Sequence, residues 1–444
     1  MFWQLPIIRV LHSGRGSVTI FFIMSGYVVT VKTVSKIHKR QPDQVLHSLS
    51  GSLFRRAFRL YIPIIVSTLI ILALVRLDAF QPDPTGRGAP PRAETLQEQL
   101  QHWYEHTVYM INPFRAITGR VALYSPPYDG HLWTIPVEFK GSVTVFTLLL
   151  AFARTRLWIR LAGVLALGCW LVQFGDFDQA LFCAGLLLAE ISCLVPLNKS
   201  ASHTTSTTLS PYWHWRNCFA HAVRHAWTIA LFILALHLLS YPEIQGPATP
   251  GFRTISKLVP GFYKGNWERI QQFWISVGSV LFIVALILSP PLHLPPMVRW
   301  RRNTSITTGI EASADPDSAA LPPSSTTLET QHPLLQRPFT TRFAQYLGRI
   351  SYSLYLAHGA VDHTVCVRWL NPAMAAWRRM EAVDAADAAL ARAWRDYCAQ
   401  ALCAALINTL VLIWVSDLFW RAIDARAVKV ARWLWVRALV TGAE

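Results

Sequence analysis

The sequence predicts an all-α protein, a bundle of helices that cross a membrane many times. Only 15% of the 444 residues are charged and 52% are hydrophobic, whereas about a quarter of the residues of a soluble domain are charged. Apolar runs of about 20 residues, the length that spans a hydrocarbon core, recur along the chain. The net charge of +16 comes from basic residues in the loops between these runs. Such placement orients helices in a membrane and indicates no nucleic-acid partner.

Nine segments qualify as transmembrane spans. They are residues 17–35, 57–77, 132–153, 157–175, 178–196, 223–241, 271–289, 343–361 and 399–420. Basic-rich loops alternate with loops of mixed charge, as the positive-inside rule requires. This alternation predicts a lumenal or outer N-terminus and a cytoplasmic C-terminus, in the endoplasmic reticulum, Golgi or plasma membrane.

The whole chain, residues 1–444, is expected to form one integral-membrane domain. Residues 301–335 interrupt it with a segment rich in Ser, Thr, Pro and Ala. Because such a composition buries little apolar surface, we expect a disordered cytoplasmic insert here. The cysteines show no C-x-x-C or Cys/His pairing, so the sequence indicates neither a metal site nor a disulfide framework.

A basic cluster runs directly into the second predicted span, in FRRAFRLYIP (residues 54–63). Arg56 and Arg59 are three residues apart and therefore share one helical face. Paired guanidinium groups bind phosphate, which on the cytoplasmic side suggests coenzyme A. The alternative is that the cluster only anchors and orients the helix.

A carboxylate lies inside the third predicted span, in DGHLWTIPVEFKGS (residues 129–142). Glu138 is about two turns into this helix, and His131 and Trp133 lie at its outer end. A buried carboxylate must either pair with a cation or become neutral. Glu138 is therefore either one half of a structural ion pair or a positioning or acid–base group.

A late span, GRISYSLYLAHGAVDH (residues 348–363), carries several polar side chains on one short helix. Ser351 and Ser353 offer a small-residue face for packing or for contact with a substrate. His358 near the lumenal end is either a packed histidine or a group that acts on an acceptor.

The first span contains Ser-Gly-Tyr within TIFFIMSGYVV (residues 19–29). Ser25 and Gly26 allow another helix to approach closely, and Tyr27 fills space while offering a hydroxyl. The simplest interpretation is a notch for helix packing.

These four segments, in this order, resemble the acyltransferase-3 superfamily of polytopic membrane O-acyltransferases, especially its fungal branch. SVTIFFIMSGYVVT is similar to the family's G-x-x-x-F-F-x-x-S-G-Y segment, and RRAFRLYIP to R-x-x-R-L-x-P. HLWTIPVEF is similar to W-x-x-x-x-E, and ISYSLYLAHG to S-Y-S-L-Y-L-x-H. The four motifs are spread over most of the chain.

The resemblance implies an enzyme that moves an acyl group, often acetyl, from acyl-CoA to a hydroxyl of a carbohydrate or small lipophilic acceptor. No permanently bound cofactor is expected, because acyl-CoA is a co-substrate. Arg56 and Arg59 match the arginines assigned to the CoA phosphates, and Glu138 and His358 match family residues assigned here as catalytic. Residues expected along the substrate path are Tyr27, His131, Trp133, Ser351 and Ser353.

The family has ten helices and begins with one that carries an Arg and a His. Nine spans are counted here, and residues 1–16 resemble the linker that follows that helix. We therefore expect a first helix to be missing from this sequence. Two other functions fit the residues: a secondary transporter of a small organic anion, and an inactive relative of the acyltransferases.

Overall fold

A computed structural model describes residues 6–83, 88–112, 125–194, 211–291, 333–382 and 387–439. Within these ranges the elements are helical, apart from one isolated β-bridge between Pro291 and Pro333. The expected all-α fold class is confirmed. The expected insert at 301–335 lies almost entirely outside the described residues. The bridge pairs Pro291 directly with Pro333.

The main helices, in chain order, have the following bounds. They are α1 (Gly14–His38), α2 (Pro42–Arg76), α3 (Leu96–Ile111), α4 (Thr134–Phe152), α5 (Leu157–Gln173), α6 (Phe177–Leu194), α7 (Pro211–Leu239), α8 (Trp267–Leu288), α9 (Arg342–Val361), α10 (Val367–Ala382), α11 (Asp387–Phe419) and α12 (Ala425–Ala438).

Seven of the described helical segments are long and apolar enough to cross a membrane. All nine segments expected to be spans are helical, but two of them fall outside this group. Helix α5 is apolar but has only 17 residues, and α9 is not among the sufficiently apolar helices. The polar side chains of α9, which include Arg349, Ser351 and His358, are the physical reason.

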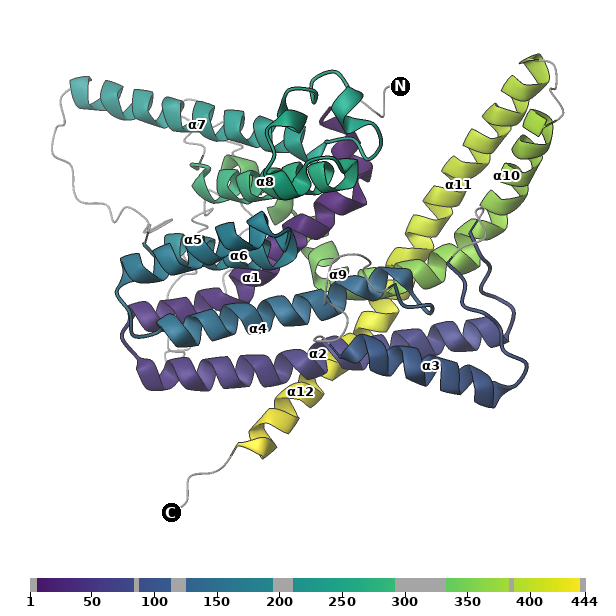
Figure 1. Cartoon of the computed structure of the whole chain (residues 1–444), viewed down its shortest axis with the longest axis horizontal. Helices are drawn as coiled ribbons and strands as arrows, with labels where there is room; N and C mark the ends of the chain where they lie inside the picture. Colours follow the sequence, from purple (N-terminus) through teal and green to yellow (C-terminus); the bar gives the residue numbers. More distant parts are fainter. Residues whose placement is uncertain are drawn as a thin grey trace, which may run out of the picture.

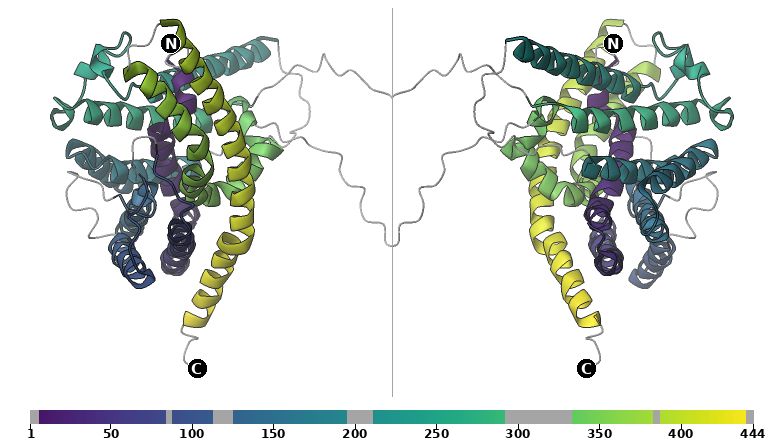
Figure 2. Two further views of the ribbon diagram at one scale, coloured as in Figure 1. Left: turned by 90° about the vertical axis from the view of Figure 1, so that its right-hand side faces the viewer. Right: turned by 90° about the vertical axis from the view of Figure 1, so that its left-hand side faces the viewer.

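The helices form one bundle with a projecting hairpin (Figure 1). Helices α1, α2, α4, α5 and α6 lie roughly alongside one another, and α7 and α8 pack together above them. Helices α10 and α11 form an antiparallel pair that extends away from the bundle, and α12 continues in the opposite direction (Figure 2). Helix α12 packs against α2.

Helix α3 is a structural element that the hydropathy pattern did not predict. It is amphipathic and begins with a capping box, in which Thr95 accepts from the Glu98 amide and Glu98 accepts from the Thr95 amide. The sequence T-x-x-E before residue 99 carries that signal. Helix α3 packs against α2.

The Ser-Gly-Tyr step in α1 is a point of close helix contact. A Cβ atom added at Gly26 would lie 2.6 Å from the Phe182 carbonyl oxygen on α6. Gly185 of α6 faces the same crossing, where Phe22, Ile23 and Phe182 are buried. The two backbones therefore approach through paired glycines, as the sequence pattern predicted.

Replacing Gly26 with Val should separate α1 from α6, because the new side chain would overlap the Phe182 backbone. We expect a loss of about 1–3 kcal/mol in stability, as for other overpacked sites. Thermal unfolding of the purified protein in detergent measures the loss. Gly14→Val is the matched control, since nothing lies within 4 Å of a Cβ there. Equal unfolding temperatures for the two variants would contradict the close contact.

Candidate functional site

The site is built around an ion pair inside the bundle. Arg56 of α2 donates through Nη2 to Glu138 Oε1 of α4 at 2.6 Å, and Ser25 Oγ of α1 donates to the same oxygen at 3.2 Å. The two charged side chains are 14% and 6% exposed. Three helices are therefore tied together at one carboxylate oxygen.

The pair leaves part of its hydrogen-bonding capacity unused. Glu138 Oε2 and Arg56 Nε are buried and have no partner among the described residues. The hydroxyls of Tyr61 and Ser353, in the neighbouring turns of α2 and α9, are also buried without a described partner. Because unsatisfied buried polar atoms are costly, this arrangement favours a site that a polar ligand or water completes.

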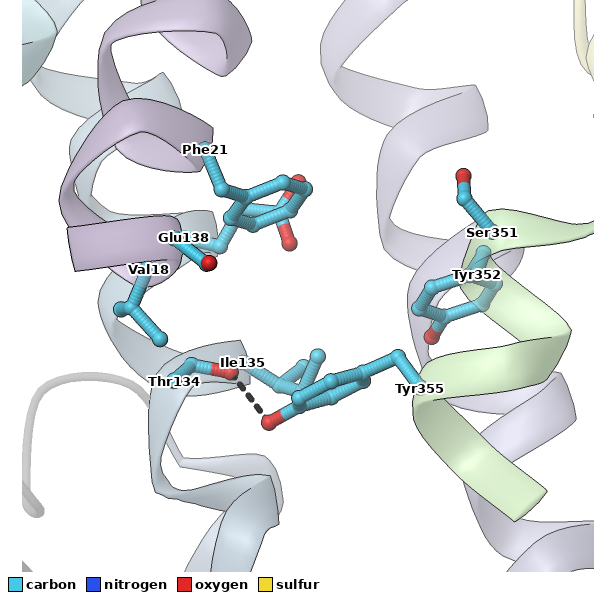
Figure 3. A pocket seen from close by; sticks show the side chains of 9 residues that line it. Val18, Phe21, Thr134, Ile135, Glu138, Ser351, Tyr352 and Tyr355 are labelled. Atoms are coloured by element: carbon cyan, nitrogen blue, oxygen red, sulfur yellow. Dashed lines mark hydrogen bonds between the residues drawn. The ribbon is translucent and has the colours of Figure 1, made fainter. Parts of the chain in front are cut away.

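A cavity of about 220 Å³ opens beside Glu138 (Figure 3). Its walls come from α1, α4 and α9, and most of its lining is apolar. The lining residues are Ser17, Val18, Phe21, Thr134, Ile135, Glu138, Ser351, Tyr352 and Tyr355. The carboxylate is the only ionisable acid or base of this lining, with two tyrosines on the opposite wall.

Tyr355 lies at the end of the cavity nearest His131. Its hydroxyl lies 2.6 Å from Thr134 Oγ1 and donates to the backbone carbonyl of His131. Tyr352 points its hydroxyl to the Leu60 carbonyl at 2.7 Å, which fixes α9 against α2. These bonds position α9 so that its next turn, with His358, lies over the start of α4.

His131 and His358 are in direct contact just beyond Tyr355. Their ring centroids are 4.2 Å apart. His358 Nδ1 lies 2.5 Å from the Tyr355 carbonyl oxygen, so this nitrogen must carry a proton and Nε2 holds a lone pair. His131 Nδ1 lies 3.1 Å from Asp129 Oδ1, which fixes the same tautomer.

The other predicted residues occupy less central positions. Arg59 is exposed on α2, the helix against which α12 packs. Tyr27 donates to Ser192 at 3.3 Å, and Trp133 packs against Phe22 in the core. Neither side chain lines the cavity. Ser351 lines it, although its hydroxyl bonds to Gly348 within α9.

Sequence reasoning missed a second buried ion pair. Arg160 of α5 donates to both oxygens of Glu190 of α6, at 2.5 and 3.0 Å, and His38 lies 2.7 Å from the same carboxylate. A lone acid in the apolar run LLLAEIS was the available signal. All of these contacts are satisfied within the protein, so we interpret this cluster as a structural clamp.

Asp129 was also missed as a separate site residue. It precedes the short helix Gly130–Trp133 and accepts from the His131 amide at 3.0 Å. The preceding Tyr128 is fully buried, and its hydroxyl exchanges hydrogen bonds with Gln99 of α3. Burial raises the pKa of the Tyr128 phenol, which keeps it neutral as a donor. Among the residues that the structure describes, no group of three side chains is arranged to hold a metal ion.

The fold and the site define an integral multi-pass membrane protein with a half-satisfied carboxylate beside an apolar cavity and two imidazoles in contact just beyond Tyr355. Residues 2–377 match the acyltransferase domain family, acyltransferase 3. The chain therefore belongs to this family and is an acyltransferase, as the four motifs indicated.

The chain is similar to three fungal acyltransferases. It is 26% identical to the O-acetyltransferase PaAT-1 of Phomopsis amygdali over 459 residues, which covers 99% of this chain and 78% of that protein. It is 25% identical to the acyltransferase clz18 of Cochliobolus lunatus over 64% of this chain and 63% of that protein. It is 23% identical to the acyltransferase R4 of a Phoma species over 64% of each chain. No solved structure matches the chain.

Breaking the Arg56–Glu138 pair from one side should be more harmful than removing both charges. Either single variant, Arg56→Gln or Glu138→Gln, leaves an unpaired partner and should cost about 3–5 kcal/mol, whereas the double variant should recover much of that loss. Thermal unfolding in detergent measures all three variants. Glu268→Gln in the exposed Arg15–Glu268 pair is the control and should change stability by less than about 1 kcal/mol. Additive losses in the double variant would show that the two side chains do not interact.

Proposed function

We propose that this protein transfers an acyl group, acetyl in the simplest case, from acyl-CoA to a hydroxyl of a small lipophilic acceptor. The observation that carries the proposal is the free oxygen of Glu138, which is buried beside a mostly apolar cavity. Family membership and the similarity to the O-acetyltransferase PaAT-1 support an ester-forming reaction.

Glu138 is proposed to act on the acceptor through Oε2. Its other oxygen is already held by Arg56 and Ser25, so the carboxylate is fixed in position before a substrate binds. A fixed acceptor of hydrogen bonds orients a hydroxyl, and such preorganisation lowers the cost of reaching the transition state. Arg56 is therefore the ion-pair partner of Glu138. The predicted contact between Arg56 and a CoA phosphate would require this ion pair to open.

His358 is proposed as a second catalytic residue at the lumenal end. Its Nε2 lone pair can accept a hydrogen bond from an acceptor hydroxyl, because Nδ1 already donates to Tyr355. An imidazole suits this role, because its ring nitrogen can accept a proton from a hydroxyl in general-base catalysis.

Arg59 remains the proposed contact for the phosphates of acyl-CoA. It is exposed on the part of α2 that carries the basic cluster. The C-terminal helix α12 lies nearby, with Trp435 packed between Phe54 and Arg55. Helix α12 is itself basic, through Arg426, Lys429, Arg432 and Arg437. By the positive-inside rule we place this face, and with it the C-terminus, on the cytoplasmic side.

The cavity distinguishes between the two acceptor classes that the resemblance allows. A sugar presents hydroxyls in every direction, and burying them without partners is costly. The cavity walls Val18, Phe21 and Ile135 offer no such partners. An alcohol with an apolar skeleton therefore fits this site better than a carbohydrate. A proton-coupled organic-anion transporter is the rival function, because intramembrane Glu and His side chains can also carry protons.

Three proteins separate catalysis from stability at the central pair. The double variant Arg56→Gln/Glu138→Gln should fold but form no ester, since the carboxylate is gone, while the wild-type protein should acylate a lipophilic alcohol from acetyl-CoA. The Glu268→Gln protein is the active control. Product is measured by mass spectrometry with a lipophilic alcohol and a monosaccharide offered together. Preferential acylation of the sugar would overturn the acceptor class, and anion counterflow without ester formation would favour transport.

Replacing Arg59 with Gln should weaken donor binding, because it removes an exposed positive charge from the basic part of α2. The KM for acetyl-CoA should rise about fivefold to tenfold, as expected for loss of one charge-assisted phosphate contact of 1–1.5 kcal/mol. The kcat should stay within about twofold. Arg421→Gln, at an exposed ion pair with Asp417, is the comparison variant. An unchanged KM would remove Arg59 from the donor site.

A further inference from the structure

Asp129 combines features of a structural cap with features that a cap does not need. Its side chain is fully buried, although it lies in a loop before the short helix Gly130–Trp133. Oδ1 accepts from the His131 backbone amide at 3.0 Å and from the His131 ring at 3.1 Å. Oδ2 is buried and has no partner among the described residues.

Two neighbouring elements hold this carboxylate in place. On one side, Tyr128 is bonded to Gln99 of α3, which fixes the backbone just before Asp129. On the other side, α9 approaches through Gly359, where an added Cβ would lie 3.1 Å from Asp129 Oδ1. The glycine lets α9 cover the carboxylate and keep bulk water away from it.

The shielded carboxylate acts on one imidazole of a touching pair. His131 is 55% exposed on its side chain and its ring contacts that of His358 at 4.2 Å between centroids. Both Nδ1 atoms are engaged by oxygens, so each ring has its Nε2 lone pair available. Of the two rings, only His131 is hydrogen-bonded to a carboxylate, and this negative charge stabilises the imidazolium that forms when Nε2 takes a proton. Asp362, on the turn after His358, also acts electrostatically on His131.

We propose that Asp129 is a positioning residue that makes His131 the proton acceptor of the acyl transfer, with His358 orienting the acceptor hydroxyl beside it. This inference rests on the proposed function. The hydroxyl proton moves to His131 Nε2 as the oxygen bonds to the thioester carbonyl carbon. The carbon–sulfur bond then breaks, and the imidazolium returns the proton to the thiolate sulfur. Coenzyme A leaves as the thiol, and His131 is neutral again.

The competing explanation is that Asp129 only caps the short helix. Asp129→Asn separates the two roles, because Asn caps a helix about as well as Asp but carries no charge. Asn266→Ala is a matched control for cap loss. Asn266 caps α8 by accepting from the amides of Glu268 and Arg269, on an element that does not line the cavity.

The first measurement is steady-state ester formation by the full chain in detergent. Asp129→Asn should lower kcat about 100-fold, at the low end of the range for general-base effects. The KM for acetyl-CoA should stay within about twofold and the unfolding temperature close to that of wild type, since the cap is kept. Asn266→Ala should lower the unfolding temperature and leave kcat unchanged. An unchanged kcat for Asp129→Asn would overturn the proposal.

The second measurement does not depend on acyl transfer. Diethyl pyrocarbonate labels neutral imidazole nitrogens, and mass spectrometry locates the label at each histidine. At about pH 8, where imidazoles are neutral, Asp129→Asn should slow labelling of His131 and leave the exposed His47 unchanged. If the wild-type protein forms no ester but His131 labelling slows, the proposed function fails while the Asp129–His131 coupling stands. Unaltered His131 labelling would overturn the coupling itself.

Discussion

The bundle depends on the hydrogen-bonded ion pair between Arg56 and Glu138. Neither charge is tolerable in an apolar bundle without the other, because the desolvation of one unpaired ion exceeds the stabilisation that a typical contact offers. The pair therefore fixes the register of α2 against α4, and Ser25 extends the same constraint to α1. Once these three helices are in register, Val18 and Phe21 of α1 and Ile135 of α4 line one side of the cavity, and the tyrosines of α9 line the other. The position of the cavity follows from the position of the charges.

Helix formation was readable from the sequence, because a membrane requires long apolar runs that satisfy their own backbone hydrogen bonds. All nine expected segments are helical, and the Gly26 notch is a point of close contact, as expected. The hydropathy pattern did not predict α3, because hydropathy detects long apolar runs and not a short amphipathic helix. Its capping box was nevertheless present in the sequence. Two of the nine expected spans, α5 and α9, fall outside the helices that are long and apolar enough to cross a membrane, because α5 is short and α9 carries polar side chains.

The individual functional residues were easier to find than their partners. Glu138 and Arg56 were each singled out because a charge inside a span is costly, but the sequence gives no measure of which helices face each other. Arg56 was consequently assigned to a CoA phosphate, whereas it contacts Glu138 at 2.6 Å. Asp129 escaped notice because an acid in a loop is ordinary, and only the packing of α3 and α9 around it makes it buried. The tertiary contacts of Asp129 distinguish it from an ordinary helix cap and make it a candidate for a role in the reaction.

Any mechanism must account for the distance between Glu138 in the cavity and the His131–His358 pair beyond Tyr355. Glu138 and His131 are seven residues apart along one helical segment, which separates them by roughly 10 Å at 1.5 Å per residue. One small hydroxyl therefore does not contact both groups at once. Under the proposed function, the reacting hydroxyl lies at the imidazole end, where a ring nitrogen can take its proton. Glu138 then holds a more distant polar group of a substrate, and the apolar wall between the two ends selects for the skeleton that connects them.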